Sequence, residues 1–71
     1  MTFELLTLAI RNNYTIEIVN FSTPLKAKML FEGNIIDLYD EHNIDLFESI
    51  KHKEVIGICP YNDILRITLK D

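Results

Sequence analysis

The chain has 71 residues, a single cysteine and a formal net charge of −4. This length predicts one small domain, residues 1–71, which buries about 60% of the surface that its unfolded chain exposes. One cysteine excludes an internal disulfide and suits a reducing compartment. The negative charge argues against direct nucleic-acid binding, which depends on Lys and Arg at the phosphates. The first residues form neither a signal peptide nor a membrane-spanning run, so we expect a cytoplasmic protein without a membrane partner.

The first half of the chain predicts one helix and two strands. Residues 3–11 carry apolar side chains at helical spacing, with Thr2 as the N-cap and Asn12-Asn13 at the end. Residues 14–20 alternate as a strand, and residues 26–32 follow as a second strand after a turn at Ser22-Thr23-Pro24. The residues of this second strand that we expect to face the core are Ala27, Met29 and Phe31.

The second half predicts a short helix and a hairpin. Residues 35–42 fit either a helix or a strand that continues past a bulge at Gly33-Asn34. Asp45 to Glu48 has the form of a capping box, in which the Glu48 side chain reaches back to the N-cap. Residues 55–70 alternate as two strands around the turn Pro60 to Asp63. The residues of this hairpin that we expect on the core face are Ile56, Ile58, Leu65, Ile67 and Leu69.

The order of these elements is α-β-β-α-β-β. It predicts an α+β fold in which two helices cover one face of a four-stranded antiparallel sheet. The other sheet face also carries apolar residues, such as Val19 and Ile64. Small size, the missing disulfide and this second apolar face together predict a homo-oligomer, with a dimer as the simplest case.

Three pieces of the pattern, Glu32-Gly33, Glu54 to Ile58 and Tyr61 to Leu65, resemble many small uncharacterised proteins of phages and mobile elements in low-GC bacteria. The resemblance is one of pattern and extends over most of the chain. The abundance of Ile and Asn fits the AT-rich genomes of such bacteria. The resemblance implies a mobile-element accessory protein in the cytoplasm of a bacterial host cell. It implies no catalytic residue and no named activity.

A block of acidic residues is the strongest functional signal. No Lys or Arg occurs between Met29 and Ile50, a stretch that holds six of the eleven acids. A surface of one sign speeds encounter with an oppositely charged partner, although it also simply keeps a small protein soluble. We predict a protein partner with a basic surface, such as one that normally holds nucleic acid. The predicted contact residues, with Tyr39 and Phe47 as aromatic anchors, are Glu32, Asp37, Tyr39, Asp40, Glu41 and Phe47.

Catalytic and metal-binding patterns are weak. The stretch from Asp37 to Glu48 partly matches a calcium loop, but His42 stands where a glycine must allow a sharp turn. His52 and Cys59 belong to no Cys-x-x-Cys or His-x-x-x-His spacing. Cys59 has no adjacent base or helix N-terminus to activate it, and two glycines cannot form a phosphate loop. We therefore expect no enzyme, no metal and no cofactor.

These patterns lead to two functional hypotheses. The first is a non-enzymatic protein-binding accessory protein of a phage or mobile element, with inhibition of a host enzyme or defence system as its role. The alternative is a structural homo-oligomer, either a virion or assembly factor or an oligomer that binds a small molecule between its subunits. The mass in solution and the capture of a partner from host lysate would separate the two hypotheses.

Overall fold

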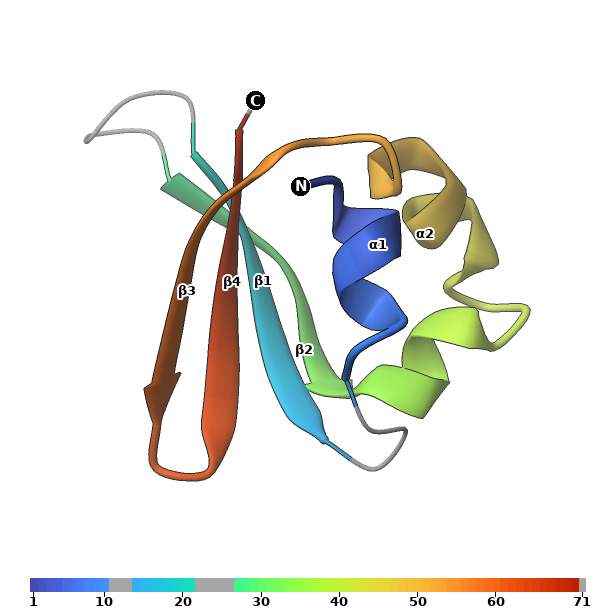
Figure 1. The fold of residues 1–71 in the computed structure, drawn as a ribbon. Coiled ribbons are helices and arrows are strands. Elements are labelled where there is room, and N and C mark those ends of the chain that lie inside the picture. Colours follow the sequence, from blue (N-terminus) through green and yellow to red (C-terminus); the bar gives the residue numbers. More distant parts are fainter. Residues whose placement is uncertain (11–13, 22–26, 71) are drawn as a thin grey trace.

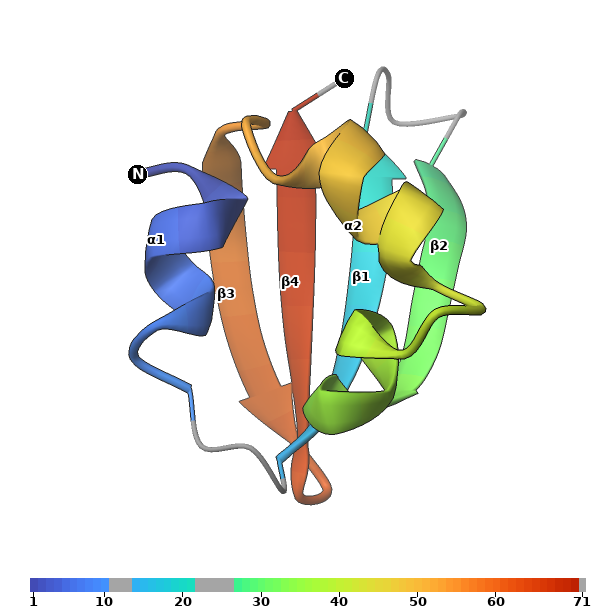
Figure 2. The ribbon, with the colours of Figure 1, turned by 90° about the vertical axis from the view of Figure 1, so that its right-hand side faces the viewer.

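The computed structural model describes residues 1–10, 14–21 and 27–70 (Figure 1). A layer of helices lies on one face of a sheet, which confirms the predicted α+β class (Figures 1 and 2). In chain order the elements are α1 (Phe3–Thr7), β1 (Thr15–Phe21), β2 (Ala27–Asn34), the 3-10 helix η1 (Ile35–Tyr39), α2 (Ile44–Ile50), β3 (Val55–Tyr61) and β4 (Ile64–Lys70).

The four strands form one mixed sheet in the order β2-β1-β4-β3. The pairs β1–β2 and β3–β4 are antiparallel, but the central strands β1 and β4 run parallel. The prediction of a wholly antiparallel sheet is therefore wrong. The reason is the crossover through η1 and α2, which leaves β2 at one end of the sheet and returns the chain to β3 at the other end (Figure 2). As a result, β4 of the second hairpin runs in the same direction as β1 of the first.

Helix α1 begins as predicted and ends earlier. The Thr2 hydroxyl accepts a hydrogen bond from the Leu5 amide at 3.4 Å, so Thr2 is the N-cap. Beyond Thr7 the amides of Leu8 and Ala9 donate to carbonyls three residues back, at 3.3 and 3.0 Å. This tighter pattern ends the α-helix. The predicted stop at Asn12-Asn13 and the turn at 22–24 lie outside the described residues.

The predicted capping box at the start of α2 is wrong. The helix begins at Ile44, and its N-cap residue Asn43 makes no side-chain cap hydrogen bond. The Asn43 side-chain amide instead donates to the Asp37 carbonyl at 3.0 Å. The Glu48 carboxylate lies 2.8 Å from the Lys51 ammonium, so it turns away from the N-terminus. The opposite charge of Lys51, one turn further along the helix, offers Glu48 a partner that the local sequence motif does not take into account.

The core lies between the helical layer and one face of the sheet. In β1 and β4 every second residue faces the core, and these core-facing residues are apolar, as predicted. Helix α1, η1 and α2 each contribute side chains from the other side. The buried hydrophobic residues are Phe3, Leu6, Ile16, Ile18, Ile35, Leu38, Ile50, Ile67 and Leu69.

A β-bulge in β2 changes which sheet face the side chains on one side of it occupy. Ile18 pairs with Phe31 but the next residue, Val19, pairs with Met29, so Leu30 is an extra residue without a partner. Met29 therefore shares the outer face with Val19 and is 47% exposed. The prediction that Met29 and Ala27 face the core is wrong, whereas Phe31 does pack against it.

A second bulge, between Val55 and Gly57, changes β3 in the same way. Val55 pairs with Leu69 and packs against the core. Ile56 is 48% exposed, contrary to the prediction. Ile58 has the predicted orientation opposite Ile67, but its place on an edge strand leaves it 45% exposed. The hairpin itself is confirmed.

The hairpin turn is shorter than predicted. Asn62 and Asp63 have φ values of 47° and 64° and form the whole loop between β3 and β4. Two consecutive positive φ values are the mark of a type I′ turn, which matches the twist of the strands. Asn and Asp tolerate this backbone better than most residues.

Candidate protein-binding surface

Helix η1 divides its residues between the core and the solvent. Because a 3-10 helix has three residues per turn, Ile35 and Leu38 share one side, and both are buried. Ile36, Asp37 and Tyr39 are consequently exposed. The Asn34 side chain caps the helix by accepting a hydrogen bond from the Ile36 amide at 3.1 Å.

The turn after η1 is closed by hydrogen bonds. The Asp40 amide donates to the Asp37 carbonyl at 3.2 Å, and the Asn43 amide donates to the Asp40 carbonyl at 2.9 Å. Asp37 on η1 and Asp40 and Glu41 on this turn are all exposed. The structure thus brings together four of the predicted contact residues. We define the acidic surface as Ile36, Asp37, Tyr39, Asp40 and Glu41.

Tyr39 is held in place by a chain of aromatic contacts. Its ring meets the ring of Phe47 edge-on, at 5.2 Å between centroids and 72° between planes. Phe47 in turn lies 6.2 Å from Phe3, which is fully buried. Tyr39 remains 41% exposed. The arrangement suits Tyr39 as an anchor whose position is fixed before binding, whereas Phe47 packs against the core and supports it from behind.

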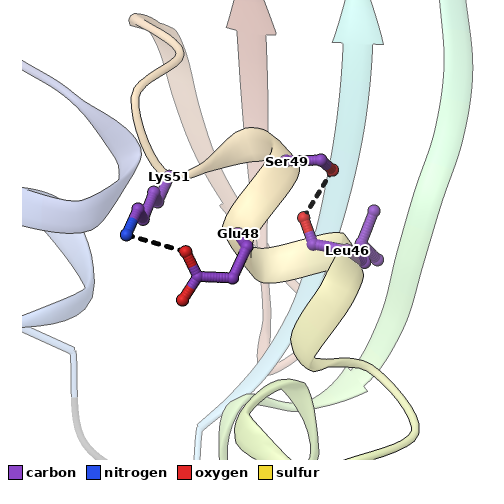
Figure 3. A network of polar contacts seen from close by, with 4 residues as sticks. All are labelled: Leu46, Glu48, Ser49 and Lys51. Carbon is purple, nitrogen blue, oxygen red and sulfur yellow. Dashed lines mark hydrogen bonds and ion pairs between the residues drawn. The ribbon is translucent and has the colours of Figure 1, made fainter.

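The charges of the acidic surface are not neutralised within the described part of the chain. No ion pair there includes Asp37, Asp40 or Glu41. Further along α2, Lys51 pairs with Glu48 (Figure 3). The hydrogen bond from Lys51 to Glu48, and then the charge of Glu48, raise the pKa of Lys51. In the same helix the Ser49 hydroxyl donates to the Leu46 carbonyl at 2.7 Å (Figure 3).

Glu32 stands apart from the other predicted contact residues. It pairs with Glu17 in the sheet, and Glu17 points away from the face that carries Ile16 and Ile18. Glu32 therefore lies on the sheet face opposite the helical layer. The sequence could not indicate this separation, since it depends on the strand register.

The residues weighed for metal chemistry are exposed and scattered. His42, His52 and Cys59 lie on the turn before α2, after α2 and on β3. Within the described residues no group of three or more His, Cys, Asp or Glu side chains could hold a metal ion. The same residues include no helix with the length and apolar character needed to cross a bilayer.

Sequence reasoning missed one ion pair on the sheet. Glu17 is only 4% exposed. One of its oxygens accepts from the Arg66 Nε and lies 3.1 Å from Nη2 as well as from Nε. The pair forms because β1 and β4 are parallel and in a register that sets Glu17 beside Arg66. No local pattern could have indicated it.

Comparisons with protein-family models, with curated proteins and with solved structures found no match for this chain.

Proposed function

We propose that this chain is a non-enzymatic protein-binding protein whose acidic surface contacts a basic surface of another protein. The resemblance in sequence pattern supports an accessory role in a phage or mobile element. Inhibition of a host enzyme or defence protein is the role that we expect from such binding. The observation that carries the proposal is an exposed tyrosine, braced by Phe47, among three carboxylates without cationic partners in the described chain.

Each part of this surface has a role in recognition. Asp37, Asp40 and Glu41 set the sign of the local potential, which speeds encounter with a basic partner. Tyr39 and Ile36 supply exposed apolar contact area next to these charges in the chain. The hydrogen bonds of the turn hold the backbone of this surface, and the Phe47 contact positions the Tyr39 ring, so binding does not have to order either of them.

The test is charge reversal on this surface. The double variant Asp37→Lys and Asp40→Lys should reduce the amount of partner that the immobilised protein captures from bacterial lysate. The matched control is Glu4→Lys with Glu54→Lys, two exposed acids outside the acidic surface. Both variants change the net charge by the same amount, and circular dichroism would check that each one folds.

The control separates a specific contact from net charge. If both variants lose the same captured proteins, or neither does, the acidic surface serves solubility alone and the proposal is wrong. Loss with the first variant only, together with loss on Tyr39→Ala, supports direct contact. Capture by the wild type should also weaken as salt is raised, since exposed charges are screened beyond about 10 Å at 0.1 M salt.

The alternative function, a structural homo-oligomer, also has a specific observation in its favour. That observation is the sheet face that the described helices leave uncovered (Figure 1).

A further inference from the structure

The described helices all lie on one side of the sheet, and the strand register defines what the other side carries (Figures 1 and 2). We call this other side the open face. Two neighbouring rows of side chains, through Glu17 and Val19, cross the middle of this face from β2 through β1 and β4 to β3. The first row is Glu32, Glu17, Arg66 and Cys59, and the second row is Met29, Val19, Thr68 and Gly57.

The second row is large at one end and flat at the other. Met29 on the edge strand β2 is 47% exposed. Gly57 on the opposite edge strand β3 has no side chain, and Thr68 lies beside it. Val19 lies half-buried on the central strand between them. The row is therefore self-complementary. A second copy that faces this one with its strand order reversed would bring its Met29 over Gly57.

Within the first row, the Glu17–Arg66 pair is self-complementary in charge. Glu17 and Arg66 are neighbours on the two central strands and form an ion pair of fixed direction across the sheet. A copy in this orientation brings its Arg66 over Glu17 and its Glu17 over Arg66. Two such pairs stacked in opposite directions attract each other, whereas two stacked in the same direction repel.

We propose that the open face packs against the open face of a second copy of this chain. The two-fold axis lies between the two sheets, parallel to the strands, midway between β1 and β4. Since these are the central strands of the sheet, the axis sets β1 over β4 and β2 over β3 of the other copy. Met29 then lies over Gly57, and the half-exposed Arg66 lies over the Glu17–Arg66 pair of the other copy, each arrangement occurring twice. Aligned packing of two twisted sheets is a common arrangement.

The edges of the sheet favour this route over pairing of edge strands. At the β3 edge the Val55 amide already donates to the Met1 carbonyl at 2.8 Å, and Pro60 has no amide hydrogen to donate. At the β2 edge the bulge at Leu30 interrupts the regular ladder. Bulges, prolines and covered amides are the devices that prevent edge-to-edge association. A second copy is therefore better placed on the open face than beside an edge strand.

Sedimentation and light scattering of the purified chain test the proposal, over about 1 µM to 1 mM, the range of weak to moderate affinities. We expect a species of twice the 8.3 kDa chain mass to appear as concentration rises. The variant Gly57→Leu fills the flat position and should weaken dimerisation about tenfold or more. A Cβ there meets Thr68 at an ordinary 3.6 Å, and circular dichroism would check that the leucine variant folds. Leu5→Ala, at an exposed position of α1 on the helical side, should leave dimerisation unchanged.

Mixing two variants tests the symmetry. In a mixed dimer of Gly57→Leu with Met29→Ala, the new leucine faces the new alanine, and the other contact is that of the wild type. The mixed dimer should therefore be tighter than the Gly57→Leu homodimer. A chain that stays monomeric throughout, dimers unaffected by Gly57→Leu, or a mixture no tighter than that homodimer would each overturn the proposal. Because none of these residues belongs to the acidic surface, either outcome leaves the test of that surface intact.

Discussion

Glu17 shows how one carboxylate can be buried on a sheet face that the described helices leave uncovered. The Arg66 side chain lies beside it and is 46% exposed, so the cation stays partly hydrated while it pairs with a buried acid. A pair of this kind costs less to form than one in which both charges lose their water. The Glu17 side chain, at 6% exposure, depends much more on the pair than the Arg66 side chain does.

The first prediction concerns this pair. Arg66→Met should lower the free energy of unfolding by about 1–3 kcal/mol, because a buried acceptor loses a charged donor. Adding Glu17→Gln to the same chain should recover part of the loss, since a neutral amide is cheaper to bury than a carboxylate. Urea unfolding at a concentration at which the chain is monomeric would measure both effects. A loss from Arg66→Met that Glu17→Gln makes larger would contradict the account.

The elements of the helical layer depend on one another through aromatic contacts. Phe47 on α2 is the shared member, since it meets both Tyr39 of η1 and Phe3 of α1. We predict that Phe47→Ala lowers the free energy of unfolding by about 2–4 kcal/mol, somewhat less than for a fully buried phenylalanine. Tyr39→Ala should cost only about 1 kcal/mol. Chemical denaturation would rank the two variants, and equal losses would mean that Tyr39 is part of the core.

Much of the element pattern could be predicted from local sequence. The alternation in β1 and β4, the Thr2 cap and the hairpin turn depend on residues near one another in the chain. The two bulges could not be predicted, because each one reflects competition between neighbouring apolar residues for the core. At β3 both Val55 and Ile56 are apolar enough to be buried. Val55 is the one that packs against the core, because it pairs with Leu69.

At the scale of the whole molecule, features that depend on residues close in the chain could be predicted, and features that depend on contacts between distant residues could not. Asp37, Tyr39, Asp40 and Glu41 are close in the chain, so their common surface could be predicted. The place of Glu32 depends on the sheet, and the direction of β1 against β4 depends on where the crossover returns the chain. Nothing in either hairpin specifies how the two hairpins meet.

The parallel pair of central strands also has a consequence for the order of folding. Each hairpin closes a short loop, but Glu17 and Arg66, which pair across β1 and β4, are 49 residues apart. Closing a longer loop costs more entropy, and contacts between distant residues slow folding. We expect both hairpins to gain protection from hydrogen exchange early in refolding and the β1–β4 bonds to follow. Pulse-labelling that protects the β1–β4 amides first would contradict this order. In the expected order, the β1–β4 pairing is the last part of the sheet to form.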